Sequence, residues 1–271
     1  MPEDHQPSLD YLIIGAGEKV CLSFHGFGQQ PEVMKYLSEP PEFHYKVISV
    51  ALHYHGNSTA PDSKSPIEVD ELIKDVELIL RKEGVERFDL SAFSIGARLA
   101  LSVLPYFAHR IDHVWLFAPD GLPVSKTYKI ATGNFLGTSA FIWLLRYAIL
   151  LRLLLWLSSS LKFIDKKTAA YFKNELKTKN LRNRIVNTWL LYRKLIPDLD
   201  QIKRSQRDSN YQITLVVGKF DKVISGKRCL KQLNEHEIKV NYIELDHGHN
   251  LMSTKAFRKL GEFIQKRVEV F

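Results

Sequence analysis

Residues 88–100, FDLSAFSIGARLA, change from the pattern of a buried strand to that of a helix within a few positions. Ser94 stands at the corner, and the residues two positions away on either side, Ala92 and Gly96, are both small. A tight strand-to-helix turn strains its central residue toward positive φ, and larger neighbours would strike the adjacent strand and helix. We therefore predict that the Ser94 side chain is pushed out above a sheet. The plainer alternative is a serine that caps an ordinary helix.

Short apolar runs alternate with helical patterns along most of the 271 residues. The predicted strands cover 9–15, 19–24, 45–52, 87–93, 113–119, 212–218 and 240–246. Helices are predicted over 65–82, 95–104 and 253–268. This alternation predicts an α/β fold, in which helices flank a mostly parallel twisted sheet with right-handed crossovers.

Local signals set some of the expected boundaries. Ser65 and Pro66 resemble an N-cap and a first helical residue, and Pro105 is expected to end the second helix. The short Gly-containing turn GAGE, 15–18, predicts antiparallel pairing of the first two strands.

The alternation stops between the runs 113–119 and 212–218. Residues 123–210 hold 17 Lys and Arg against 5 Asp and Glu, whereas the rest of the chain holds 21 against 25. We predict a core made of 1–122 and 211–271 and a basic, helical insertion over 123–210.

The insertion contains an apolar run over 141–157, FIWLLRYAILLRLLLWL. Its 17 residues are short for a membrane span, and Arg146 and Arg152 would each cost roughly 2.5–3.5 kcal/mol at a bilayer centre. We favour a helix whose apolar side covers the predicted site. A helix lying on a membrane surface is the alternative, and peripheral membrane contact follows from it.

Composition excludes several other classes. The N-terminal segment is acidic and polar, so we expect no signal peptide, and the two cysteines lie far apart, so we expect neither a disulfide framework nor a zinc site. A cytoplasmic location is the expectation. No nucleic-acid partner is expected despite the pI of about 9.3, because no known module is present.

Two further stretches supply partners for Ser94. The stretch LDHGHNLM, 245–252, offers His247 and His249, and VVGKFDKVIS offers Asp221. A base must remove the proton of a serine before it attacks, and a carboxylate can orient that base. All of these residues follow predicted strands, where open α/β sheets bind their ligands.

A glycine-rich turn follows the run 19–24. In SFHGFGQQP, 23–31, the backbone N–H of Phe27 is expected to pair with that of Ile95 as an oxyanion hole. A simple glycine turn is the alternative.

Together these stretches resemble the α/β-hydrolase superfamily. AFSIG, 92–96, matches its nucleophile turn, HGFG, 25–28, its oxyanion loop, GKFD, 218–221, its acid turn and DHGHN, 246–250, its histidine loop, while HYHGNS, 53–58, is similar to a further loop of the family. Residues 123–210 then occupy the position of the family's cap. The residues expected to support the nucleophile turn and the oxyanion loop are His25, Gly26, Ala92 and Gly96.

The sequence departs from the family pattern at two positions and leaves two assignments with alternatives. Ala92 replaces a glycine, and Phe93 replaces a residue that is commonly polar. Asp120 is the second candidate for the acid, and His247 is the second candidate for the base.

The resemblance implies a serine hydrolase that cleaves a small carboxylic ester or thioester. Ser94 would attack the carbonyl, His249 would accept its proton, and Asp221 would orient His249. No metal or organic cofactor is expected, and the substrate is expected to carry an apolar acyl group. The basic insertion favours an anionic substrate or is simply solvated surface. Alternatives are a non-catalytic ligand- or partner-binding member, and a C–C hydrolase or peroxidase-type variant.

Overall fold

The structure is a computed structural model that describes residues 8–39, 43–59, 65–124, 126–133, 135–147 and 177–268. The chain divides into two compact units, each described here by itself. The core unit comprises residues 1–60, 68–123 and 195–271, and the second unit comprises residues 61–67 and 124–194.

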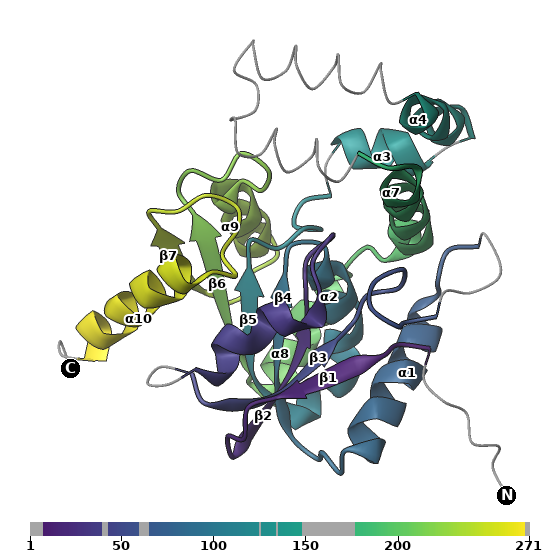
Figure 1. The fold of residues 1–271 in the computed structure, drawn as a ribbon. Coiled ribbons are helices and arrows are strands. Elements are labelled where there is room, and N and C mark those ends of the chain that lie inside the picture. Colours follow the sequence, from purple (N-terminus) through teal and green to yellow (C-terminus); the bar gives the residue numbers. More distant parts are fainter. Residues whose placement is uncertain are drawn as a thin grey trace, which may run out of the picture. The chain divides into compact units, whose positions relative to one another are not determined.

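A seven-stranded sheet forms the centre of the core unit (Figure 1). Its strands are β1 Tyr11–Ile14, β2 Lys19–Phe24, β3 Tyr45–Val50, β4 Phe88–Phe93, β5 Ile111–Phe117, β6 Gln212–Gly218 and β7 Asn241–Leu245. The order is β1-β3-β2-β4-β5-β6-β7, and every neighbouring pair except β1 with β3 is parallel. The predicted α/β fold with a mostly parallel sheet is therefore confirmed.

Helices cover both faces of this sheet. The helical elements of the core unit are η1 Pro31–Ser38, α1 Val69–Lys82, α2 Gly96–Phe107, η2 Ala108–Arg110, α8 Leu199–Ser209, α9 Gly226–Glu235 and α10 Thr254–Val268. Residues of η1 and α10 join strand residues in one buried apolar cluster, whose members include Met34, Val216 and Leu260. Helices α1 and α8 both pack against α2, which contacts β2, β4 and β5. Burial on both faces is nearly continuous along β2, β3, β4 and β6, whereas the edge strands β1 and β7 are partly exposed.

The predicted antiparallel pairing of the first two strands is wrong. Strand β1 pairs with β3, and β3 lies between β1 and β2. The glycine turn, 15–18, crosses the backbone just before β3 instead of closing a hairpin. The two backbones lie so close that a Cβ at Gly17 would be 1.7 Å from the carbonyl oxygen of His44. The glycines therefore permit a close backbone crossing.

The start of α1 also differs from the prediction. Ser65 and Pro66 precede the helix, which begins at Val69. Glu68 is the N-cap, and its side chain and that of Glu71 form a reciprocal capping box. Glutamate is an uncommon N-cap, so the sequence favours the more usual Ser-Pro pair.

Helix α2 continues past Pro105 to Phe107 and so does not end where expected. Proline removes one hydrogen bond to the preceding turn. Phe107 is buried, and its ring lies 6.1 Å from that of Phe88. This packing stabilises the last turn despite the missing bond.

The second unit contains α3 Lys126–Gly133, α4 Phe135–Arg146, α7 Lys179–Leu191 and η3 Tyr192–Lys194. Its aromatic centre is Trp189, whose ring lies 5.1 Å from both Tyr128 and Phe141. The predicted insertion ended at 210, but residues 195–210 belong to the core unit, where α8 packs against α2. The position of the insertion as a cap over the site stays a prediction.

The apolar run 141–157 is described only as far as residue 147, so most of that prediction lies outside the described residues. Among the residues that are described, no helix has the length and apolar character needed to cross a membrane.

Candidate active site

The turn between β4 and α2 has the strained geometry predicted for it. Ser94 has a φ of 52°, a conformation uncommon for any residue but glycine. Its N–H donates to the carbonyl of Phe117 at 3.0 Å, and its own carbonyl accepts from the N–H of Asp120 at 2.9 Å. These bonds to the end of β5 stabilise the strained residue.

Small neighbours are required here, as predicted. A Cβ at Gly96 would lie 2.4 Å from the carbonyl oxygen of Phe24 and 2.5 Å from that of His25. Ala92 is fully buried in the centre of the sheet, between β2 and β5. The first helical turn therefore packs directly on the backbone that leads into the loop 25–28.

Ser94, His249 and Asp221 form a chain of two hydrogen bonds, which we call the relay. The Ser94 Oγ lies 3.1 Å from His249 Nε2, and His249 Nδ1 lies 2.7 Å from Asp221 Oδ2. A carboxylate accepts, so Nδ1 carries the proton and Nε2 is left to accept from the serine hydroxyl. This tautomer is the one a general base needs.

The carboxylate of the relay is held by its own turn. The Asp221 side chain is fully buried, and its Oδ1 accepts the N–H groups of Val223 at 2.7 Å and Ile224 at 2.9 Å. With Oδ2 on the imidazole, both oxygens are engaged. The carboxylate is thereby fixed in the orientation that holds the His249 ring.

Backbone contacts bring the acid and histidine loops together. The N–H of Phe220 donates to the carbonyl of His247 at 3.0 Å, and that of Lys219 donates to Leu245 at 2.9 Å. A Cβ at Gly218 would lie 2.4 Å from the carbonyl oxygen of Gly248. The glycine at the end of β6 thus allows the loop after β7 to lie directly against it.

The His249 ring is only partly covered. Its side chain is 23% exposed, and its ring centroid lies 5.3 Å from that of Phe93. Phenylalanine, where the family commonly has a polar residue, therefore packs against the His249 ring. Gly26 leaves room for this ring, because a Cβ there would lie 2.7 Å from Phe93 Cδ1.

The two second candidates make other contacts. Asp120 Oδ2 accepts from Nε of the fully buried Arg98 at 2.8 Å, and its Oδ1 accepts from the N–H of Gly121. The Nδ1 of His247 lies 3.3 Å from the carbonyl of Gly248. The structure thus brings Asp221 and His249 to Ser94 and engages Asp120 and His247 elsewhere.

The predicted oxyanion loop, residues 25–28, is anchored by His25. The buried His25 ring has Nδ1 2.8 Å from the carbonyl of Gly26, and its Nε2 lies 3.1 Å from the N–H of Leu52. A carbonyl only accepts and an N–H only donates, so these partners require a neutral ring. His25 therefore ties the loop to the end of β3.

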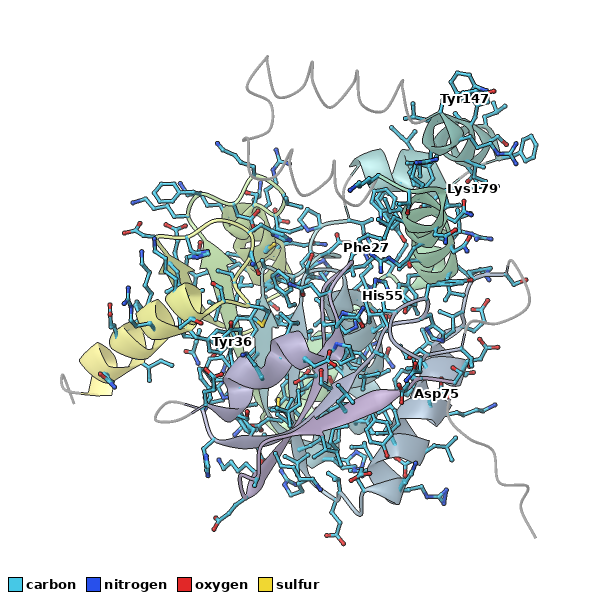
Figure 2. All side chains as sticks on the ribbon, in the orientation of Figure 1. Phe27, Tyr36, His55, Asp75, Tyr147 and Lys179 are labelled. Carbon is cyan, nitrogen blue, oxygen red and sulfur yellow. The ribbon has the colours of Figure 1, made fainter. Side chains whose placement is uncertain are left out.

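A second histidine, which the sequence did not single out, holds the same loop. The N–H of Gly28 donates to His55 Nε2 at 3.0 Å, and His55 Nδ1 donates to the carbonyl of His53 at 3.0 Å. The Phe27 ring packs edge-on against His55, with 5.3 Å between centroids (Figure 2). The motif HYHGNS, 53–58, is similar to a further loop of the family, but it does not indicate that His55 bonds to Gly28.

Further bonds extend from this loop to α1. His53 Nε2 lies 3.2 Å from Ser8 Oγ, and the Ser8 hydroxyl donates to Asp75. Burial, followed by the charge of His55, lowers the pKa of His53 to about 4. His53 is therefore neutral at pH 7.

The positive end of a helix completes the site. Ile95 directly precedes α2, and the N–H groups of Ala97 and Arg98 donate to the carbonyls of Ser94 and Ile95, both at 3.0 Å. The positive end of the helix dipole favours negative charge beside Ser94. The predicted pairing of the Phe27 and Ile95 amides stays a prediction.

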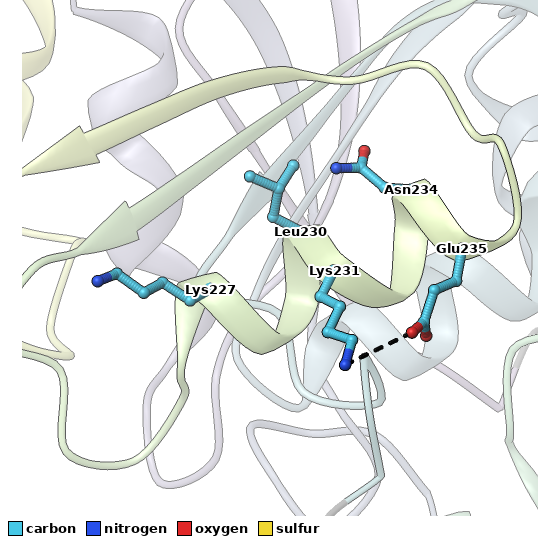
Figure 3. Close-up of a pocket in the computed structure, with 5 residues that line it drawn as sticks. All are labelled: Lys227, Leu230, Lys231, Asn234 and Glu235. Carbon is cyan, nitrogen blue, oxygen red and sulfur yellow. Dashed lines mark ion pairs between the residues drawn. The ribbon is translucent and has the colours of Figure 1, made fainter.

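Two other features contribute no chemistry to the site. Burial raises the pKa of the Cys229 thiol to about 12, so this cysteine is protonated and inert. A shallow surface pocket is lined entirely by α9 (Figure 3), which carries none of the relay residues. It presents one ion pair, between Lys231 and Glu235.

Comparisons with known proteins agree with this architecture. Residues 20–256 match the model of the alpha/beta hydrolase fold family. The chain therefore belongs to that family. A search of curated proteins finds no match.

Solved structures with the same fold include three hydrolases. A thermophilic esterase from Thermogutta terrifontis is 15% identical, with a TM-score of 0.65 and coverage of 95% of this chain and 93% of that one. An enol-lactonase from Burkholderia xenovorans LB400 is 16% identical, with a TM-score of 0.61 and coverage of 95% of this chain and 96% of that one. A meta-cleavage product hydrolase from Pseudomonas fluorescens IP01 is 15% identical, with a TM-score of 0.60 and coverage of 96% of each chain. At these sequence identities, the likeness to the three structures shows a shared fold alone.

Proposed function

We propose that the protein is a serine hydrolase that cleaves a small carboxylic ester or thioester through an acyl-enzyme on Ser94. The observation that carries this proposal is the relay, whose two distances are 3.1 and 2.7 Å. A ligand-binding protein has no need of a strained serine bonded to an imidazole that is itself bonded to a buried carboxylate. The esterase and enol-lactonase among the structural neighbours support ester chemistry.

In the first half-reaction, Ser94 Oγ attacks the substrate carbonyl carbon while its proton moves to His249 Nε2. Asp221 stays ionised and stabilises the imidazolium. The amides of Phe27 and Ile95 donate to the oxyanion, and loss of one such donor costs about 10²–10³ in rate. When the tetrahedral intermediate collapses, the proton passes from His249 to the leaving alcohol or thiol.

In the second half-reaction, water attacks the acyl-Ser94 carbonyl and His249 accepts the water proton. Collapse returns that proton to Ser94 Oγ and releases the carboxylic acid, so the enzyme regains its starting state. The partly exposed ring of Phe27 in the loop 25–28 supports an apolar acyl group next to the scissile bond.

Steady-state hydrolysis of a p-nitrophenyl ester series and a matching acyl-CoA series tests this proposal. We expect saturable turnover that falls by about 10⁶-fold in Ser94→Ala, because the nucleophile is absent. Ser38→Ala, which changes a serine of η1, serves as the matched control and keeps its activity. A folded protein without turnover on either series, or with equal turnover in Ser94→Ala, would contradict the proposal.

A further inference from the structure

Helix α4 presents an apolar face to solvent. The side chains of Phe135, Leu136 and Trp143 are 83%, 78% and 55% exposed, and Tyr147, directly after the helix, is 53% exposed. Positions 136, 143 and 147 lie on one side of a helix, because residues separated by three or four positions are neighbours there. A soluble surface rarely gathers so many large apolar side chains.

The opposite side of α4 accounts for its packing within the second unit. Leu145 is buried, and the Phe141 ring stacks on Trp189 of α7 with centroids 5.1 Å apart. The exposed face is therefore additional to the one that stabilises this unit. On it, the rings of Trp143 and Tyr147 contact each other with centroids 4.9 Å apart.

The charged side chains that the structure describes in the second unit share one sign. Among the described residues of the second unit, 126–133, 135–147 and 177–194, every charged side chain is basic. They are Lys129, Arg146, Lys177, Lys179, Arg182, Arg184, Arg193 and Lys194. Figure 2 shows Lys179 at the start of α7 and Tyr147 beyond the end of α4, two elements that pack together. Cations thus border the apolar face and complement an anionic partner.

We propose that this face binds the surface of an anionic phospholipid bilayer. Phe135, Leu136 and Trp143 would enter the boundary between headgroups and acyl chains, where aromatic side chains are favoured, and Lys129 and Arg146 would meet lipid phosphates. Both of these cations are exposed, and they belong to α3 and α4. Binding is peripheral and does not require a membrane-spanning helix.

The combination of features favours a bilayer over other acidic partners. Nucleic acids are bound mainly through their phosphates, sugars and base edges, so a wide apolar face contributes little to such binding. Helices that lie in a bilayer interface combine Trp, Phe and Leu on one side with Lys and Arg beside them. This inference does not depend on the proposed catalytic function.

Sedimentation with phospholipid vesicles tests the proposal with the full chain. Vesicles of mixed phosphatidylglycerol and phosphatidylcholine should bind the protein, and pure phosphatidylcholine should bind it much more weakly. The double variant Leu136→Ser, Trp143→Ser should raise the apparent Kd at least about tenfold, because two apolar anchors are lost. Lys129→Glu with Arg146→Glu should weaken binding and reduce its dependence on salt.

Tyr106→Ser is the matched control, since Tyr106 is a 45% exposed aromatic residue of α2 in the core unit. It should bind vesicles as the unaltered protein does, and circular dichroism establishes that every variant is folded. Absence of vesicle binding by the unaltered protein would overturn the proposal. Equal binding by the Leu136/Trp143 variant would also overturn it, because the attraction would then be that of any polyanion. Hydrolysis of a soluble ester, measured in parallel, separates this result from the proposed function.

Discussion

The edge of the core sheet and the exposed face of α4 use side chains in opposite ways. At the sheet edge, His25, His55 and His249 each have bonds at both ring nitrogens, and these bonds fix the tautomer and the ring plane. On α4, large side chains project into solvent, and the charged side chains described in the same unit are all basic. Chemistry at a defined atom requires fixed directions, whereas adhesion to a fluid surface requires only area and charge.

If orientation matters at the sheet edge, Asp221→Asn should have the largest effect among folded variants that keep the nucleophile and base. An amide keeps the shape but can favour the wrong tautomer of His249, so we expect kcat to fall by about 10⁴-fold. Steady-state kinetics on the best ester measure it.

Asp120→Asn is the matched control, because that carboxylate bonds Arg98 rather than the imidazole. This variant should lower the free energy of unfolding, because it weakens the ion pair of the buried Arg98, and it should change kcat much less than Asp221→Asn does. Equal losses of kcat in the two aspartate variants would mean that Asp221 has no special role.

A smaller effect is expected when the loop 25–28 loses one anchor. His55→Ala removes the acceptor for the N–H of Gly28, so the Phe27 amide is less well aimed. We expect kcat to fall by up to about 100-fold and KM to change little. This fall is no larger than the one expected when a whole oxyanion donor is lost.

His113→Gln tests whether this effect is specific. His113 is a partly buried histidine near the start of β5, bonded to Thr214. Its replacement should change the melting temperature without changing kcat. A fall of kcat in both variants in proportion to lost stability would assign His55 a structural role alone.

The same loop predicts a dependence of stability on pH. His53 has a folded pKa of about 4 against 6.5 when unfolded, so the unfolded state binds more protons as pH falls. Its contribution is complete above pH 6.5 and is lost as pH approaches 4. Between pH 7.5 and 4.5 this amounts to about 2–3 kcal/mol of unfolding free energy. Urea unfolding at both values should show a weaker pH dependence in His53→Gln, and an unchanged dependence would refute the assignment.

The smallest effect is expected on the other side of the comparison. Trp143→Ser should leave the unfolding free energy within about 0.5 kcal/mol and leave kcat/KM on a soluble ester unchanged, because the side chain is exposed. A fall of kcat/KM by tenfold or more would show that this face contacts the substrate instead, as predicted for a helix whose apolar side covers the site.

Much of the core could be read from the sequence because its signals are local. Short motifs predicted the strained φ of Ser94 and the small residue at Gly96. They also singled out Asp221 and His249, which the structure brings to Ser94. The strand runs matched because burial on both faces leaves continuous apolar stretches.

What the sequence missed depends on partners distant along the chain. The pairing of β1 with β3 is decided by a crossing at His44, which no local pattern reveals. His55 gains its role only when Gly28 is brought beside it. The N-cap at Glu68 and the helix past Pro105 reflect reciprocal bonding and packing that override residue preference.

Reaction with a fluorophosphonate, followed by peptide mass spectrometry, tests the central claim most directly. Attack of an activated serine on phosphorus displaces fluoride and leaves a stable adduct. We predict one adduct on Ser94, none in Ser94→Ala, a strongly slowed reaction in His249→Ala and near-normal labelling in Asp120→Asn. A folded protein that carries no adduct, or carries it on another residue, would contradict the claim that the relay activates Ser94.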